Sequence, residues 1–180
     1  MRIITGSLKG RRLKTPKNDK IRPTSDKVKE AIFSMLFDEF YAEPVCDLFA
    51  GTGNLGLEAL SRGASRCYFA DSQKESLSII KSNIEYCNIG DRAVLLSGDY
   101  AVALQRIREK LAVIFLDPPY DANYMPSAIN MIDSLDLLRD GGLIVAEHSI
   151  SEKLEDSIGG FEKIKEKEYG KIAVSIYRKV

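Results

Sequence analysis

One stretch of the sequence couples a buried strand to an abrupt end, and it reads Val113-Ile114-Phe115-Leu116-Asp117-Pro118-Pro119-Tyr120. Its apolar first half is typical of a parallel strand that is buried on both faces. The two prolines lack the N–H group that a central strand needs, so the strand must end at Asp117. Ligands bind at the carboxyl ends of the strands in open α/β sheets, so we expect this turn at the rim of an active site.

The polar groups of this turn suit methyl transfer to an exocyclic amino nitrogen of a nucleobase. Such a nitrogen is a poor nucleophile because its lone pair is delocalised into the ring, and it needs acceptors that hold its hydrogens. Asp117 and the Pro118 carbonyl can supply two acceptors, which the proline rings keep in place. Tyr120 can stack on the base. The predicted catalytic residues are Asp117, Pro118, Pro119 and Tyr120, and an ordinary surface turn is the alternative.

Length and composition indicate one soluble domain. The chain has 180 residues, of which 44% are hydrophobic and 29% are charged. It contains no apolar run near the roughly 20 residues that span a bilayer, and no secretory signal at its N-terminus, which favours a cytoplasmic location. The three cysteines lack CxxC spacing and lie in or beside apolar segments, so we predict neither disulfides nor a metal site.

The net charge of zero conceals an uneven distribution. Residues 1–30 contain ten Lys and Arg residues and three Asp and Glu residues, a net charge of +7, so residues 31–180 carry −7. A basic arm on an acidic body is typical of proteins that bind a polyanion, because each neutralised phosphate releases counterions. A solvated basic tail is the alternative interpretation.

Residues 1–14 of this arm contain short apolar pieces separated by two glycines, a pattern that predicts a small β-hairpin. Residues 15–21 are polar and loop-like, so we expect the hairpin to project from the body. The chain is therefore divided into a basic hairpin and loop at residues 1–24 and a larger domain at residues 25–180. The candidates for contacts with phosphates are Lys9, Arg11, Arg12 and Arg22.

A helix is predicted to follow Arg22-Pro23-Thr24. Thr24 or Ser25 can serve as its N-cap, and apolar residues recur at helical spacing from Val28. Because Arg22 precedes a proline, we expect it to be extended, with its guanidinium directed at a phosphate or across the cofactor pocket. A surface arginine without a role is the alternative.

From Val45 the pattern becomes strand, helix, strand. Residues 45–49 predict a strand, residues 50–56 form a glycine-rich turn and residues 57–62 open a helix. Gly51, Gly53 and Gly56 fit the G-x-G-x-x-G spacing that lets a ligand approach the backbone. The strand at residues 66–70 ends at Asp71, where an acid can bind ribose hydroxyls. Together these features predict an adenosine-binding site.

Asp99 is a third acid at the end of a strand, here residues 94–97. It could accept a hydrogen bond from an adenine amino group, with Tyr100 beside the ring. It could equally be the N-cap of a helix at residues 101–109.

The remaining segments predict a helix at 126–138, a Gly-Gly turn, a strand at 143–146, a helix at 151–158 and two antiparallel strands at 161–168 and 172–177. This makes seven strands in all. His148 is the single histidine, and no nucleophile signature accompanies it, so we interpret it as non-catalytic.

The motifs DLFAGTGNLG at 47–56, Asp71, Asp99 and DPPY at 117–120 resemble those of class I S-adenosylmethionine-dependent amino-methyltransferases. The N-terminal segments RIITG at 2–6, GRR at 10–12, RPT at 22–24 and DKVKEAIF at 26–33 resemble, more narrowly, the bacterial 16S ribosomal RNA guanine-N2 methyltransferase family. Asp71 stands where that family usually has a glutamate, which keeps the carboxylate but shortens its reach.

This resemblance implies a Rossmann-like α/β fold with a seven-stranded mixed sheet, a reversed final strand and helices on both faces. It implies S-adenosylmethionine as cofactor and a guanine of 16S rRNA as target, and it leaves open whether the substrate is free RNA or a 30S particle. We expect a monomer, although no sequence pattern decides the oligomeric state. The expected cofactor-binding residues are Asp47, Phe49, Gly51, Thr52, Gly53, Asp71, Asp99 and Tyr100.

Three other functions share part of this pattern. The DPPY motif alone does not separate guanine N2 from adenine N6, so an N6-adenine methyltransferase acting on DNA or RNA is one alternative. A nicotinamide-dependent oxidoreductase shares the glycine loop and the acid but leaves the DPPY motif unexplained. A non-catalytic RNA-binding module would explain the basic arm but not the cofactor loop.

Overall fold

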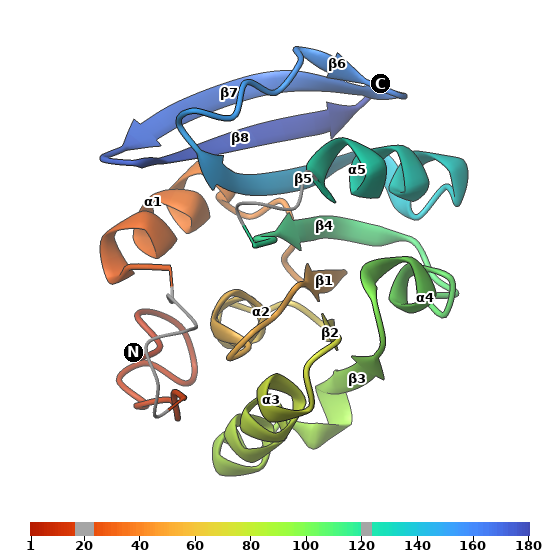
Figure 1. The fold of residues 1–180 in the computed structure, drawn as a ribbon. Coiled ribbons are helices and arrows are strands. Elements are labelled where there is room, and N and C mark those ends of the chain that lie inside the picture. The colour runs from red at the N-terminus through yellow and green to blue at the C-terminus, as the bar shows by residue number, and fades with distance from the viewer. Residues whose placement is uncertain (17–23, 120–123) are drawn as a thin grey trace.

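The computed structural model of the chain describes residues 1–16, 24–119 and 124–180, and within them eight strands form one mixed sheet (Figure 1). The strand order is β3-β2-β1-β4-β5-β8-β7-β6. The first five strands are parallel, whereas β8, β7 and β6 are added antiparallel to their neighbours. The strands are β1 (Pro44–Leu48), β2 (Arg66–Asp71), β3 (Ala93–Ser97), β4 (Leu111–Leu116), β5 (Leu138–Ser149), β6 (Ser157–Ile158), β7 (Phe161–Tyr169) and β8 (Ile172–Lys179).

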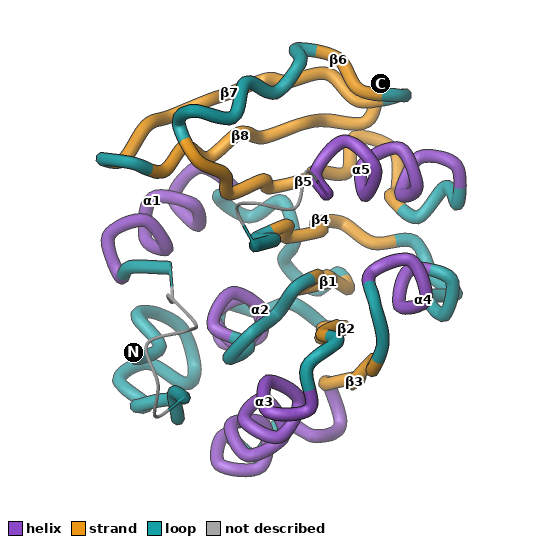
Figure 2. Tube along the Cα trace, viewed as in Figure 1, coloured by secondary structure: helices purple, strands orange, loops and turns teal. Residues whose placement is uncertain are grey.

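Helices cover both faces of this sheet (Figure 2). They are α1 (Asp26–Leu36), α2 (Asn54–Ser61), α3 (Lys74–Cys87), α4 (Tyr100–Leu104) and α5 (Tyr124–Ser134). Helices α1, α2 and α3 lie on one face, and α4 and α5 lie on the other. The predicted Rossmann-like mixed sheet with a reversed final strand is confirmed, and the eighth strand is the two-residue β6, which the sequence pattern did not reveal.

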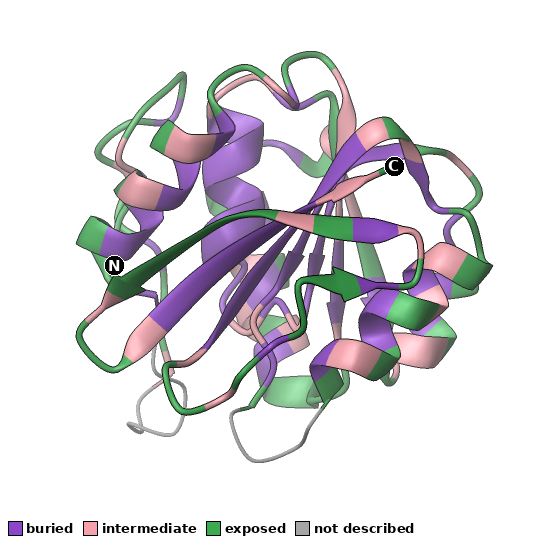
Figure 3. Cartoon of the chain, turned by 90° about the horizontal axis from the view of Figure 1, so that it is seen from above, coloured by how far each residue is buried: buried purple, intermediate pink, exposed green. Residues whose placement is uncertain are grey.

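The central strands are buried on both faces, as the apolar run at residues 113–116 predicts (Figure 3). Val113 and Phe115 of β4 belong to the core beneath α1, α2 and α3, while Ile114 and Leu116 belong to the core beneath α4 and α5. Each such side chain contributes about 1.5–3 kcal/mol on full burial. The strand is thereby held firmly where it ends at Asp117.

The N-terminal residues turn back on themselves, as predicted, but with a single antiparallel bridge between Arg2 and Arg12. The expectation that this hairpin projects from the body is wrong. Ile3, Leu8 and Leu13 are buried in the core beneath α1, α2 and α3, at 0%, 7% and 6% exposure. The apolar pieces between the basic residues are therefore anchors for the arm.

Three predictions of local structure are also wrong. The helix predicted at 126–138 ends at Ser134, because Leu138 already begins β5 and pairs with Leu111. Gly141 and Gly142 lie inside β5, at a shift in register against β4, and do not form a turn before it. Residues 151–158 form a turn and an irregular segment that ends in β6, which pairs with the start of β7.

The helix predicted at 101–109 is also shorter than expected, since α4 ends at Leu104. Turn hydrogen bonds from the backbone N–H groups of Arg106 and Ile107 follow directly, and Ile107 turns into the core. The first helix matches its prediction, with the Ser25 hydroxyl accepting a hydrogen bond from the N–H of Val28 at 3.3 Å. Ser25, and not Thr24, is therefore the N-cap.

Candidate active site

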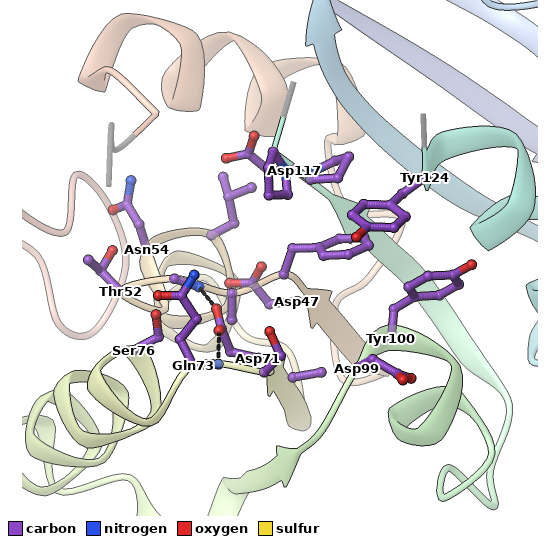
Figure 4. A pocket seen from close by; sticks show the side chains of 18 of the residues that line it. Asp47, Thr52, Asn54, Asp71, Gln73, Ser76, Asp99, Tyr100, Asp117 and Tyr124 are labelled. Atoms are coloured by element: carbon purple, nitrogen blue, oxygen red, sulfur yellow. Dashed lines mark hydrogen bonds between the residues drawn. The ribbon is translucent and has the colours of Figure 1, made fainter. Parts of the chain in front are cut away.

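A pocket of about 770 Å³ lies at the carboxyl ends of the parallel strands (Figure 4). It brings together the predicted residues Asp47, Phe49, Gly51, Thr52, Asp71, Asp99, Tyr100, Asp117, Pro118 and Pro119. Gly53 is not among the residues that line it. The predicted residues Tyr120 and Arg22 lie outside the part of the chain that the structure describes.

The glycine loop between β1 and α2 adopts a conformation that side chains disfavour. Gly51 and Gly53 have φ values of +57° and +78°, in the left-handed region where glycine carries no steric penalty. A Cβ atom on Gly56 would lie only 2.4 Å from the ring of Phe69 on β2. The first two glycines thus shape the loop, and the third permits close packing of helix on strand.

Asp71 at the end of β2 holds this loop in place. One carboxylate oxygen accepts a hydrogen bond from the N–H of Gly51 at 2.9 Å, and the other accepts one from the N–H of Gln73 at 2.8 Å (Figure 4). A carboxylate oxygen has two lone pairs, so each can accept a second hydrogen bond. Asp71 can therefore brace the backbone and still bind a hydroxyl group of a ligand.

Asp47 on β1 is 2% exposed, and one of its oxygens accepts a hydrogen bond from the N–H of Gly56 at 2.8 Å. Burial, joined by the charge of Asp71, raises the pKa of Asp47 to about 7, although the bond from Gly56 acts against that rise. A positive ligand group in the pocket would lower this pKa again. The carboxylate therefore suits a cationic ligand.

Asp117 lies beside a second acid, Glu147, because of the strand register. Leu116 of β4 is paired with Ala146 of β5, and Asp117 and Glu147 are the next residues of the two strands. The hydroxyl oxygen of Thr24 lies 3.0 Å from Glu147 Oε2 and 3.4 Å from Asp117 Oδ2. Burial, then the charges of Glu147 and Asp47, raises the pKa of Asp117 well above its usual value, against the Thr24 hydrogen bond.

Asp99 is the N-cap of α4, with its Oδ1 accepting a hydrogen bond from the N–H of Val102 at 2.9 Å. The alternative role, as an acceptor for adenine, stays a prediction, and the residue does line the pocket.

The aromatic side chains of Phe49, Tyr100 and Tyr124 lie together in the pocket lining. The ring centroid of Phe49 lies 5.7 Å from that of Tyr100 and 5.9 Å from that of Tyr124, which stacks on it.

Sequence reasoning missed several residues of this region. It considered Thr24 as a helix cap and as part of the RPT motif but not as a pocket residue, assigned no role to Glu147 and did not select Tyr124. The position of Glu147 directly after an apolar strand was the available signal, since Asp71, Asp99 and Asp117 of the pocket also follow strands. Nothing in the local pattern singles out Thr24 or Tyr124.

A buried ion pair behind the pocket was also missed. Lys29 of α1 and Glu58 of α2 both have side chains with 0% exposure, and their charged atoms are 3.2 Å apart. The Lys29 ammonium also donates to the carbonyl of Arg2 at 2.6 Å and to Asn54 Oδ1 at 2.7 Å. The amide of Asn54 in turn donates to the carbonyl of Thr24 at 3.3 Å. The arm, two helices and the rim of the pocket are thus connected.

Lys9, Arg11 and Arg12 of the arm lie outside the pocket. Lys9 and Arg12 are exposed. The Arg11 guanidinium donates to the carbonyl of Tyr86 at 2.7 Å and lies 5.7 Å from the centroid of its ring. Part of the basic charge is therefore used to attach the arm to α3.

His148 and the three cysteines do not line the pocket. His148 is buried, with its Nε2 atom 2.9 Å from the hydroxyl of Ser175. The three cysteines are free and buried.

Among residues 1–16, 24–119 and 124–180, no group of three or more His, Cys, Asp and Glu side chains could hold a metal ion. Over the same residues, every helix is too short or too polar to cross a membrane.

The model of the family described as "Conserved hypothetical protein 95" matches residues 1–178. The chain belongs to this family. It is 38% identical over 182 residues to "Putative rRNA methyltransferase YlbH" of Bacillus subtilis, covering 99% of both chains. It is 31% identical over 183 residues to "Ribosomal RNA small subunit methyltransferase D" of Haemophilus influenzae, covering 99% of this chain and 93% of that one.

The solved structures include a close match to this member of the Conserved hypothetical protein 95 family. "Putative methyltransferase yhhF from Escherichia coli" is 28% identical, with a TM-score of 0.89 over 99% of this chain and 97% of that one. The resemblance that the sequence motifs indicated is confirmed by these relatives, and so is the class I methyltransferase fold.

Proposed function

We propose that the protein is an S-adenosylmethionine-dependent rRNA methyltransferase that transfers a methyl group to the exocyclic N2 of a guanine in 16S rRNA. The observation that carries this proposal is that Asp117 and Pro118 share one pocket with the glycine loop of the predicted adenosine-binding site. The names of the relatives support methylation of small-subunit rRNA, and the choice of guanine N2 rests on the resemblance of the N-terminal segments.

The pocket fits S-adenosylmethionine in size and charge. Its volume of about 770 Å³ lies within the usual range for small-molecule sites. The ligand carries an ammonium and a sulfonium group, and the raised pKa values of Asp47 and Asp117 indicate carboxylates that gain from a nearby cation. In this proposal the methionine part lies near Asp47, Gly51, Thr52 and Gly53, the ribose at Asp71, and the adenine near Phe49, Asp99 and Tyr100.

When it is bound, S-adenosylmethionine supplies an electrophilic methyl group. Asp117 and the carbonyl of Pro118 accept hydrogen bonds from the guanine amino group, which orients its lone pair toward that methyl group. Asp117 also stabilises the positive charge that develops on nitrogen. Pro119 helps to hold the turn rigid, and Tyr120, known here from the sequence alone, stacks on the flipped or unpaired base.

The basic arm provides the contacts with RNA in this proposal. Lys9 and Arg12 are exposed and can reach phosphates, while Arg11 and Arg22 complete the predicted set. The 16S rRNA is bound as free RNA or within a 30S subunit or assembly intermediate, in the cytoplasm, by a monomeric enzyme. No step of this chemistry needs a metal ion or a membrane.

The test is methyl transfer from labelled S-adenosylmethionine to ribosomal subunits and to naked rRNA, both taken from cells that lack the protein. Label in N2-methylguanosine from 16S rRNA is the expected result, and the better substrate reveals the assembly stage. Label in N6-methyladenosine would keep the chemistry and replace the target base. Absence of label in both RNA preparations, with the cofactor bound, would overturn the proposed activity.

A further inference from the structure

Three carboxylates at the ends of adjacent strands lie on one face of the sheet. Asp47 and Asp117 line the pocket, and Glu147 contacts the pocket residue Thr24. Residues 113, 115 and 145 belong to the core beneath α1, α2 and α3, so the alternation of side chains places Asp117 and Glu147 on that face. Asp47 of β1, the strand next to β4, follows Val45 of the same core by two positions. Figure 4 shows Asp47 and Asp117 in the same pocket. The site thus contains more hydrogen-bond acceptors than the hydrogens of the target amino group require.

Thr24 connects two of these carboxylates. Its hydroxyl oxygen lies 3.0 Å from Glu147 Oε2 and 3.4 Å from Asp117 Oδ2. A hydroxyl group has one hydrogen to donate and lone pairs that accept. It can therefore donate to Glu147 while it accepts a hydrogen bond from a protonated Asp117, which is the order of donors and acceptors that a proton relay needs.

The position of this hydroxyl group is set by the surrounding structure. Thr24 is 6% exposed, and its carbonyl accepts a hydrogen bond from the side-chain amide of Asn54 at 3.3 Å. The oxygen of that amide is held by the buried ammonium of Lys29 at 2.7 Å. The backbone of Thr24 is thus held by Asn54 and Lys29, which are not part of the row formed by Asp117, Thr24 and Glu147.

We propose that Thr24 and Glu147 relay the proton that leaves the methylated amino group away from Asp117. The inference rests on the proposed methyl transfer. The nitrogen lone pair forms the new N–C bond, the C–S bond breaks with its electrons on sulfur, and one N–H bond then breaks with its electrons on nitrogen. Asp117 takes that proton and passes it to the Thr24 oxygen, whose own proton moves to Glu147. Asp117 is left ionised, and the acquired proton resides on Glu147.

The relay also balances the charge of the site. Methyl transfer converts a sulfonium into a neutral thioether, so the pocket loses one positive charge, and the proton retained on Glu147 replaces it. Among residues 1–16, 24–119 and 124–180, the groups facing Asp117 are Glu147 from β5, Asp47 from β1 and Thr24 from the segment before α1. Lys29 of α1 does not supply this charge to the pocket, because its ammonium is bound to Glu58, Asn54 and the carbonyl of Arg2.

The experiment measures the single-turnover rate of RNA methylation as a function of pH for the wild type and for Glu147→Gln, Thr24→Val and Thr24→Ser. We expect the maximal rate of Glu147→Gln and Thr24→Val to fall by about 10²-fold, in the range of lost acid–base catalysis. Thr24→Ser keeps the hydroxyl group and should stay within about threefold of the wild type, far short of that loss. Glu162→Gln on exposed β7 is the matched control for the loss of a carboxylate.

The pH profiles give a signature that a merely structural role would not produce. The rate rises with pH as Asp117 ionises. Loss of the charge of Glu147 lowers the pKa of Asp117, so the rising limb of Glu147→Gln moves to lower pH. While Asp117 is ionised the Thr24 hydroxyl can donate to it, and the hydroxyl turns its hydrogen to Glu147 once Asp117 is protonated. Loss of the bond to ionised Asp117 raises that pKa, so the limb of Thr24→Val moves to higher pH.

Wild-type maximal rates in both Glu147→Gln and Thr24→Val would overturn the relay, and so would lowered rates without opposite shifts of the two profiles. Melting temperature and affinity for S-adenosylmethionine are measured alongside. If Glu147→Gln does not fold, the comparison of Thr24→Val with Thr24→Ser decides alone. A wild-type enzyme that forms no N2-methylguanosine refutes the proposed function, whereas active wild type with unaffected variants refutes only the relay.

Discussion

Two regions of this molecule bury charged side chains, and they treat them in opposite ways. Behind the pocket, Lys29 and Glu58 neutralise each other at 3.2 Å with both side chains fully buried. Glu58 also accepts hydrogen bonds from the N–H groups of Ile4 and Thr5 and from Arg62. In the pocket, Asp47 and Asp117 lie near other carboxylates, which contribute to their raised pKa values.

The difference separates architecture from function. A buried ion pair with its hydrogen bonds satisfied needs nothing from outside, and removing either partner leaves a costly charge. Clustered carboxylates are costly in the free protein, and that cost is relieved by a positive ligand. Burial lowers the pKa of Lys29 while Glu58 raises it, which is compensation within the fold. In the part of the chain that the structure describes, the charges that act on Asp47 and Asp117 are those of other carboxylates, so both gain from positive charge that a ligand brings.

The largest expected effect is that of Asp117→Ala on catalysis. It removes one acceptor of the amino group together with the charge that stabilises the developing cation. Turnover should fall by about 10³-fold or more, while affinity for S-adenosylmethionine, measured by calorimetry, should change far less. Near-normal turnover of this variant would contradict the assignment of Asp117.

Breaking the ion pair should act on stability. Lys29→Met removes the fully buried cation of Glu58 and leaves it with the partly exposed Arg62, and we expect a loss of about 3–5 kcal/mol in the free energy of unfolding, measured by denaturant titration. The double variant Lys29→Met with Glu58→Gln should recover part of that loss. Lys74→Met on the exposed side of α3 is the matched control. Equal stability of the control and Lys29→Met would show that the pair is unimportant.

Asp47→Asn should stabilise the free protein and weaken cofactor binding. The pKa of Asp47 is raised from 3.8 to about 7, so the folded state holds more protons than the unfolded state between these values. Stability contributed by this group therefore falls as pH rises from 3.8 toward 7, and the asparagine variant escapes that fall. Near about pH 4 the variant should show no gain in melting temperature. Above about pH 7 the gain should be several degrees, because ~1 kcal/mol of stability shifts Tm by roughly 2–4 °C. A gain independent of pH would contradict this explanation.

The smallest effect concerns the exposed arm. Neutralising Lys9 and Arg12 together, as glutamines, should weaken RNA binding and lower the salt dependence of the binding constant by roughly 0.9 for each phosphate that the variant no longer neutralises. Filter binding over a range of salt concentrations measures this slope. Lys167→Gln, an exposed lysine on β7, serves as the comparison. An unchanged slope would mean that these two side chains do not contact phosphates.

The features that sequence reasoning found share a local origin. A strand that ends at a proline, glycines at fixed spacing and an acid after an apolar run are each written within a few residues. These local patterns are sufficient to place Asp47, Asp71 and Asp117 in one pocket. The three acids then lie close together because the parallel sheet brings the ends of its strands to a common edge.

The features that it missed depend on contacts between distant segments. Thr24 meets Glu147 across 123 positions, and Lys29 meets Glu58 through the packing of α1 on α2. A lysine within a helical pattern is ordinarily placed in solvent. The N-terminal arm contacts Lys29 through the carbonyl of Arg2, and the seating of that arm was predicted wrongly.

The docking of the arm bears on how this enzyme could have diversified. The N–H groups of Ser7 and Leu8 are bonded to the backbone and hydroxyl oxygens of Ser61, and a Cβ atom on Gly6 would collide with the Ser61 carbonyl at 1.9 Å. Recombination that exchanged the first residues alone would therefore introduce a segment that lacks matching contacts with α2. Inheritance of a new arm requires coordinated change at positions 58 and 61, so this part of the chain is expected to evolve together with α2 and not as an interchangeable module.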